Sequence, residues 1–65
     1  MIKTVIRCVD NMVMVFDEKG EQIPEYQGQY GEVREGILRD APSTAVFSHS
    51  SDSKPELQEV PRGEW

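Results

Sequence analysis

Two polar residues, Asp10 and Asn11, interrupt an otherwise β-branched and apolar stretch near the start of the chain. A short polar break between two such runs is typical of a β-hairpin with a two-residue loop. Residues 2–9 and 12–17 are then antiparallel strands, and the loop sets Val9 opposite Met12. This hairpin constrains the fold more than any other feature, because its register decides which side chains share a face.

The predicted register makes both faces of the hairpin apolar. Side chains alternate between the two faces of a strand. One face carries Ile6, Cys8, Val13 and Val15. The other face carries Val5, Val9, Met12, Met14 and Phe16, together with Lys3 and Arg7. A sheet face in contact with water normally carries polar residues, so we expect the second face to be covered or used for binding.

A helix is predicted from Pro24 to about Arg39. Proline is favoured at the first helical position, and four apolar side chains recur at steps of four, three and four residues. These four are Tyr26, Tyr30, Val33 and Ile37. Gly28 and Gly31 lie outside this stripe, which favours local looseness of the helix, with close approach of a backbone or ligand as the alternative.

Residues 44–49 form the predicted third strand, which follows the helix. The element order is then ββαβ, an α+β fold with one helix on one face of a three-stranded sheet. We expect the third strand to lie beside residues 2–9 and antiparallel to them, with parallel pairing beside residues 12–17 as the alternative. Residues 1–49 are the predicted domain.

The segment 50–65 is rich in Ser, Asp, Glu and Pro, and we expect a flexible or weakly ordered C-terminal tail. Ser53 to Glu56 matches a helix capping box, which would align Leu57 and Val60 on one face of a helical turn. A second interpretation is that these two residues anchor the tail together with Trp65, because tryptophan buries a large apolar area in a groove.

The charge balance disfavours nucleic acid as a partner. The chain has 12 acidic and 7 basic residues, for a net charge of −5, and the basic residues are spread along the sequence. A polyanion would therefore be repelled. No apolar run is long enough for a signal peptide or a membrane span, so we expect a cytoplasmic protein with no membrane partner.

One cysteine and one histidine limit the chemistry that the chain can perform. Cys8 has no second cysteine for a disulfide, and with His49 it falls short of a four-ligand zinc site. In the predicted register Cys8 faces the core, where a thiol is inert, and His49 stands at a strand end. We therefore expect no metal, no cofactor and no catalytic activity.

A chain of 65 residues without a disulfide buries little surface, and association is the usual way to compensate. The leading hypothesis is a small non-catalytic protein-interaction module, a homodimer or a binder of another protein, acting through the exposed sheet face or an edge strand. The alternative is a small-molecule-binding or regulatory domain in which Arg7 holds an anionic group on the same face. The candidate surface comprises Val5, Arg7, Met12, Met14, Phe16, Leu57, Val60 and Trp65.

Overall fold

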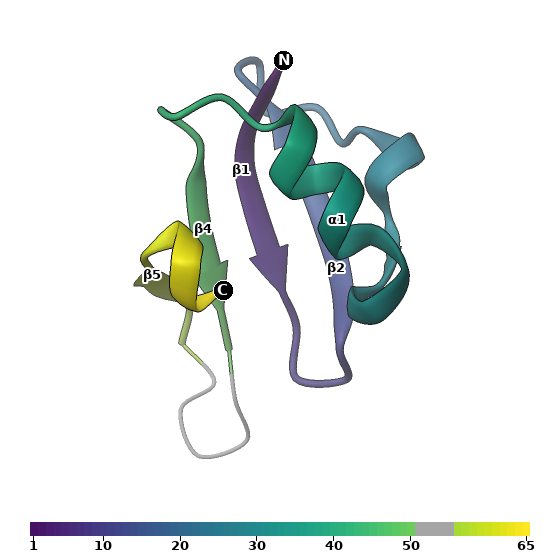
Figure 1. Ribbon diagram of the computed structural model, residues 1–65, viewed down its shortest axis with the longest axis vertical. Coiled ribbons are helices and arrows are strands. Elements are labelled where there is room, and N and C mark those ends of the chain that lie inside the picture. Colours follow the sequence, from purple (N-terminus) through teal and green to yellow (C-terminus); the bar gives the residue numbers. More distant parts are fainter. Residues whose placement is uncertain (51–55) are drawn as a thin grey trace.

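The computed structural model describes residues 1–50 and 56–65, which form an α+β fold with one five-stranded sheet and one α-helix. The helix, α1, spans Tyr30–Asp40 and lies across one face of the sheet (Figure 1). The strands are β1 (Ile2–Arg7), β2 (Met12–Asp17), β3 (Gly28–Gln29), β4 (Val46–His49) and β5 (Gln58–Val60). Two short 3-10 helices complete the described part, η1 (Pro24–Tyr26) and η2 (Arg62–Glu64). The expected α+β class is confirmed, whereas the expected three-stranded sheet has five strands.

Counted between the residues that close it, Cys8 and Met12, the hairpin loop contains three residues instead of the predicted two. Cys8 and Met12 close it, since the Cys8 amide donates to the Met12 carbonyl at 2.8 Å. Asn11 ends the loop with φ of 70°, a left-handed conformation that asparagine tolerates better than most residues. A three-residue loop of this kind, with its last residue left-handed, is a common hairpin connection.

The longer loop shifts the register of β1 against β2 by one residue. Val5 pairs with Val15, where the sequence predicted Phe16 as its partner. A shift of one residue turns every side chain of one strand to the other face. The faces predicted for the side chains of β2 are therefore correct, and those predicted for β1 are exchanged. Val5 lies under the helix with Val13 and Val15, fully buried, and Ile6 points to the opposite face.

The predicted helix from residue 24 is an α-helix only from Tyr30 onward, because η1 and the short strand β3 precede it. The apolar stripe is correct where the helix exists, since Ile37 is fully buried and Val33 packs against the core. Gly28 lies in β3 with φ of 158°, and a Cβ there would come within 3.2 Å of a Val33 methyl group. The close approach of the Val33 side chain, which is neither a backbone nor a ligand, accounts for a glycine at position 28. A Cβ at Gly31 would meet open space.

Strand β4 lies beside β1, as expected, but it is parallel to β1 and not antiparallel. The reason is β3, which pairs antiparallel with β2 and so reverses the direction of the chain before α1 begins. The helix starts at the hairpin end of the sheet, where the Tyr30 amide donates to the Asn11 carbonyl at 2.9 Å. A helical crossover between two strands of one direction produces the parallel pair.

The expected flexible tail is wrong for residues 56–65, which pack on the domain. Residues 58–60 form β5, antiparallel to β4 with Val60 opposite Phe47, where the sequence predicted a helical turn. Trp65 is 3% exposed and belongs to the core. Most of the predicted capping box, residues 53–55, lies outside the described residues. The described core comprises Ile2, Val5, Val13, Val15, Ile37, Ala41, Phe47 and Trp65.

Trp65 is held by aromatic contacts and hydrogen bonds from several elements. Its ring meets Tyr30 and Phe47 edge to face, with centroid distances of 5.1 and 5.0 Å. The indole Nε1 donates to the Ser48 carbonyl at 3.1 Å, and the Tyr30 hydroxyl donates to the Trp65 carbonyl. Just before it, Arg62 donates to the Ala41 and Pro42 carbonyls at the C-terminal end of α1. A cation is stabilising at that end of a helix.

Candidate functional site

The sheet has a second face, turned away from α1, which we call the open face. Cross-strand partners point to the same side of a sheet, so the pairs of Ile6 with Met14 and of Thr4 with both Phe16 and Val46 define this face. Gln29 of β3, opposite Met12, and Glu59 of β5, opposite Ser48, lie at its two edges. Its central part, from β1, β2 and β4, comprises Thr4, Ile6, Cys8, Met12, Met14, Phe16, Val46 and Ser48. Ser48 is buried and the other seven are partly exposed, so apolar side chains here are in contact with water.

None of these eight central residues is Asp, Glu, Lys, Arg or His, although 29% of the residues in the chain are charged. A face of a β-sheet that is exposed to water usually carries alternating polar and charged residues. Glu59, on the short strand β5 opposite Ser48, lies on the same side of the sheet at its edge. The central part of the open face is therefore an apolar patch without charged residues on an acidic protein.

The predicted candidate surface is only partly brought together. Three of its members, Met12, Met14 and Phe16, lie on the open face. The others lie elsewhere, with Val5 and Trp65 in the core, Val60 packed against the core, Arg7 on the helix side and Leu57 exposed near β5. Ile6, Cys8 and Val46 were not predicted on this face. Cys8 in particular was expected in the core, and the shifted register moves it out.

Arg7 does not stand on the apolar face as an anion-binding group. The register places it opposite Val13, on the helix side. Its guanidinium carbon lies 3.5 Å from the centroid of the Tyr30 ring, and its Nε donates to the Asn11 side chain at 2.8 Å. A cation over an aromatic face is attracted by the ring quadrupole. Arg7 thus joins the hairpin to the first residue of α1, and the hypothesis of an anion held on the open face is not supported by its position.

The edges of the sheet leave little backbone for a docking strand. Strand β2 is covered along its outer side, where β3 pairs with Met12 and Val13 and the Ile23 amide donates to the Val15 carbonyl at 2.8 Å. On the other side β5 covers Phe47 to His49 of β4. The outermost strands, β3 and β5, have two and three residues. Edges this short offer few unpaired groups to a partner.

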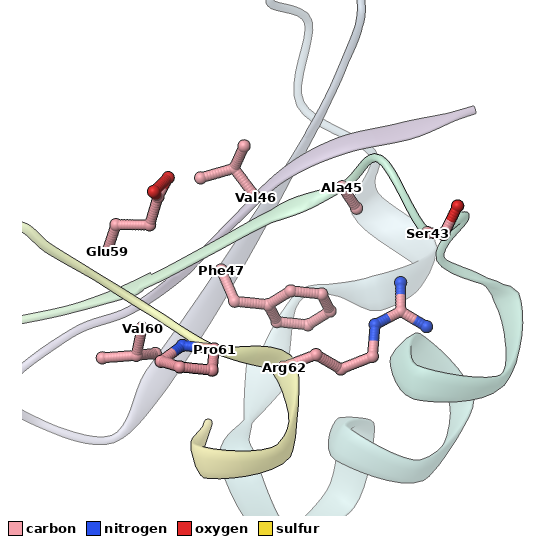
Figure 2. Close-up of a pocket in the computed structure, with 8 residues that line it drawn as sticks. All are labelled: Ser43, Ala45, Val46, Phe47, Glu59, Val60, Pro61 and Arg62. Carbon is pink, nitrogen blue, oxygen red and sulfur yellow. The ribbon is translucent and has the colours of Figure 1, made fainter.

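A shallow cleft of about 390 Å³ lies beside β4, where the chain turns away from it after β5 (Figure 2). Arg62 crosses the cleft, with its guanidinium carbon 5.2 Å from the centroid of the Phe47 ring. Its Nη2 is already engaged with two backbone carbonyls. The cleft is lined by Ser43, Ala45, Val46, Phe47, Glu59, Val60, Pro61 and Arg62.

Cys8 and His49, the one cysteine and the one histidine of the chain, lie on opposite sides of the sheet. His49 pairs with Arg7 and shares its face, whereas Cys8, the next residue along β1, points to the open face. In the described ranges, 1–50 and 56–65, no three side chains of His, Cys, Asp or Glu gather into a group that could hold a metal ion.

Two carboxyl groups have pKa values below their ordinary range, and hydrogen bonds explain both. The backbone N–H of Glu21 donates to Asp17 at 2.9 Å and lowers the pKa of that carboxyl. The Tyr26 hydroxyl donates to Asp40 at 2.6 Å and lowers the pKa of Asp40. The first bond closes the turn after β2, and the second joins η1 to the end of α1. Both groups are parts of connections between elements.

Comparison of the sequence with protein-family models and with curated proteins, and of the structure with solved structures, finds no significant match. Among the described helices, none has the length and apolar character needed to cross a bilayer.

Proposed function

We propose that this protein is a non-catalytic interaction module that self-associates through its open face. The observation that carries the proposal is the uncharged, partly exposed apolar patch on that side of the sheet. Contiguous apolar patches with polar surroundings mark interaction sites in soluble proteins. Sheets stack face to face about 10 Å apart, so two open faces can meet without rearrangement of either sheet.

The charge of the chain favours a second copy as the occupant of this face. Each copy has a net charge of −5, so association through a charged surface would bring like charges together. The eight central side chains of the open face carry no charge, and two copies can meet there with Glu59 at the edge of the contact. A twofold interface uses the same patch on both partners, which an apolar, uncharged face permits.

Two further considerations support the face over an edge strand. The edges expose only the short strands β3 and β5. In addition, a chain of 65 residues buries only about 60% of the surface that its unfolded form exposes, so covering a second apolar layer adds substantially to its stability. Self-association through the face therefore serves both binding and folding.

Small-molecule binding is the second candidate, and the cleft beside β4 is the observation that favours it. Its volume of about 390 Å³ lies in the lower part of the range for ligand sites. We place this candidate behind self-association, because the Arg62 guanidinium in the cleft is already occupied by the Ala41 and Pro42 carbonyls.

Met14→Lys is expected to weaken self-association by at least about tenfold, because a twofold interface would then contain two ammonium groups without partners. The measurement is sedimentation velocity over a range of concentrations, with far-UV circular dichroism to check the fold. Val9→Lys is the matched control, since Val9 is 55% exposed in the hairpin loop and the change in charge is the same. Self-association of Met14→Lys at the level of the parent would refute the proposal.

A further inference from the structure

Sulfur side chains are concentrated at one end of the open face. The chain contains one cysteine and three methionines. Cys8, Met12 and Met14 all lie on the open face at the hairpin end of β1 and β2, and Met1 is the only sulfur residue outside this group. All three are partly exposed in the single chain, so an ion in solution can reach them before two copies associate. We call these three residues the sulfur cluster.

The hairpin places the members of the sulfur cluster within reach of one another. Cys8 and Met12 are cross-strand neighbours, because the Cys8 amide donates to the Met12 carbonyl at 2.8 Å. Side chains in such a pair have Cβ atoms about 5 Å apart. Met14 is two residues further along β2 on the same face, opposite Ile6 and diagonal to Cys8. Diagonal neighbours are about 7–8 Å apart, a separation that a methionine side chain can span.

The chemistry of these ligands selects a soft ion. A thiolate with two thioethers suits Cu(I), whereas Mg²⁺ and Ca²⁺ require oxygen ligands. The eight central residues of the open face include no carboxylate, and Glu59 lies at the β5 edge. We infer that Cys8, Met12 and Met14 form a three-coordinate binding site for a soft monovalent cation, Cu(I). Binding releases the thiol proton of Cys8, because the thiolate is the ligand.

One existing contact involves the sulfur cluster. The Gln29 side-chain amide donates to the Met12 sulfur at 2.8 Å. A thioether is a weak hydrogen-bond acceptor, so a metal–sulfur bond can replace this contact or use the other lone pair. Gln29 stands opposite Met12 on β3, and its side chain holds the thioether over the sheet.

The test is a titration of the purified chain with Cu(I) under anaerobic conditions, against a chromophoric Cu(I) chelator. We expect one ion per chain. Cys8→Ser abolishes binding, and Met12→Leu and Met14→Leu each lower the affinity by at least about tenfold, the loss that follows even from removal of an outer-shell partner. Leucine preserves apolar volume, so these variants keep the open face and separate this site from self-association. Phe16→Leu, on the same face without sulfur, is the control and should bind as the parent does.

A direct readout on the folded chain uses Ag(I) as a redox-stable substitute for Cu(I). The ε-methyl NMR signals of Met12 and Met14 should shift on addition of one equivalent, while that of Met1, which is 79% exposed and outside the cluster, should not. If Cys8→Ser removes binding and both leucine variants bind as tightly as the parent, the thiol acts alone. That result would overturn the three-ligand site, as would a shift of all three methionine signals together.

Discussion

Val13→Lys is expected to abolish the folded state. Val13 is fully buried in β2, on the helix side of the sheet with Val5, Val15 and Ile37. An ammonium group without a partner in such a site is destabilising by several kcal/mol, and a core in a chain of this length supplies only about 3–5 kcal/mol. Thermal unfolding followed by far-UV circular dichroism measures the effect.

Met14→Lys is the matched control for this substitution, since the two positions are adjacent and differ only in the face they occupy. Met14 is partly exposed on the open face, so its lysine variant should remain folded. At concentrations low enough for the parent to be monomeric, it should melt close to the parent. Equal loss of structure in both variants would mean that both faces of β2 are covered within one chain. The assignment of the open face would then be wrong.

Trp65→Ala is expected to reduce the free energy of unfolding by about 3–5 kcal/mol, the usual range for removal of a buried aromatic ring. The substitution removes both edge-to-face contacts, with Tyr30 and Phe47, and the hydrogen bond from Nε1 to the Ser48 carbonyl. This loss is comparable with the stability that a core of this size supplies, so far-UV circular dichroism should show the variant largely unfolded. Urea unfolding gives the difference from the parent where a transition remains.

Leu57→Ala provides the comparison for the Trp65 substitution. Leu57 is 56% exposed, so its truncation should change the free energy of unfolding by less than about 0.5 kcal/mol. In the parent, Trp65 fluorescence should be shifted to the blue because the indole is removed from water. Similar, small effects of the two substitutions would contradict the docking of the C-terminal segment.

The elements that local patterns determine were predictable from the sequence. Alternating β-branched and apolar residues identified β1 and β2, and the run before His49 identified β4. The spacing of Tyr30, Val33 and Ile37 gave the correct face of α1, because the period of a helix is visible in a single segment. The α+β class follows from the order of these elements.

The register of the hairpin was wrong because the backbone conformation of Asn11 decides it. The polar residues Asp10 and Asn11 are compatible with a loop of two or of three residues. The pair lacks the glycine that would have favoured one loop type. Asn11 adopts the left-handed conformation and the loop gains one residue. That single difference moved Val5 into the core and brought Ile6 and Cys8 to the open face.

The order of the C-terminal segment was missed because its stabilising contacts are long-range. The Tyr30 hydroxyl bonds the Trp65 carbonyl across 35 positions, and Arg62 reaches the Ala41 carbonyl across 21. The sequence-based prediction compared only the apolar residues of the tail with the entropy lost when the tail becomes ordered. It did not include these hydrogen bonds or the pairing of β5 with β4. Of the residues predicted for the candidate surface, Met12, Met14 and Phe16 lie together on the open face, and the others lie elsewhere.

The most direct test of the account is the concentration dependence of methyl NMR signals in the purified chain. Self-association through the open face predicts that the signals of Ile6, Met14 and Val46 shift on dilution from millimolar to micromolar concentration. Val15 and Ile37, which lie in the core under α1, should stay in place. Dilution shifts confined to residues around β5, or no shifts at any concentration, would contradict self-association through the open face.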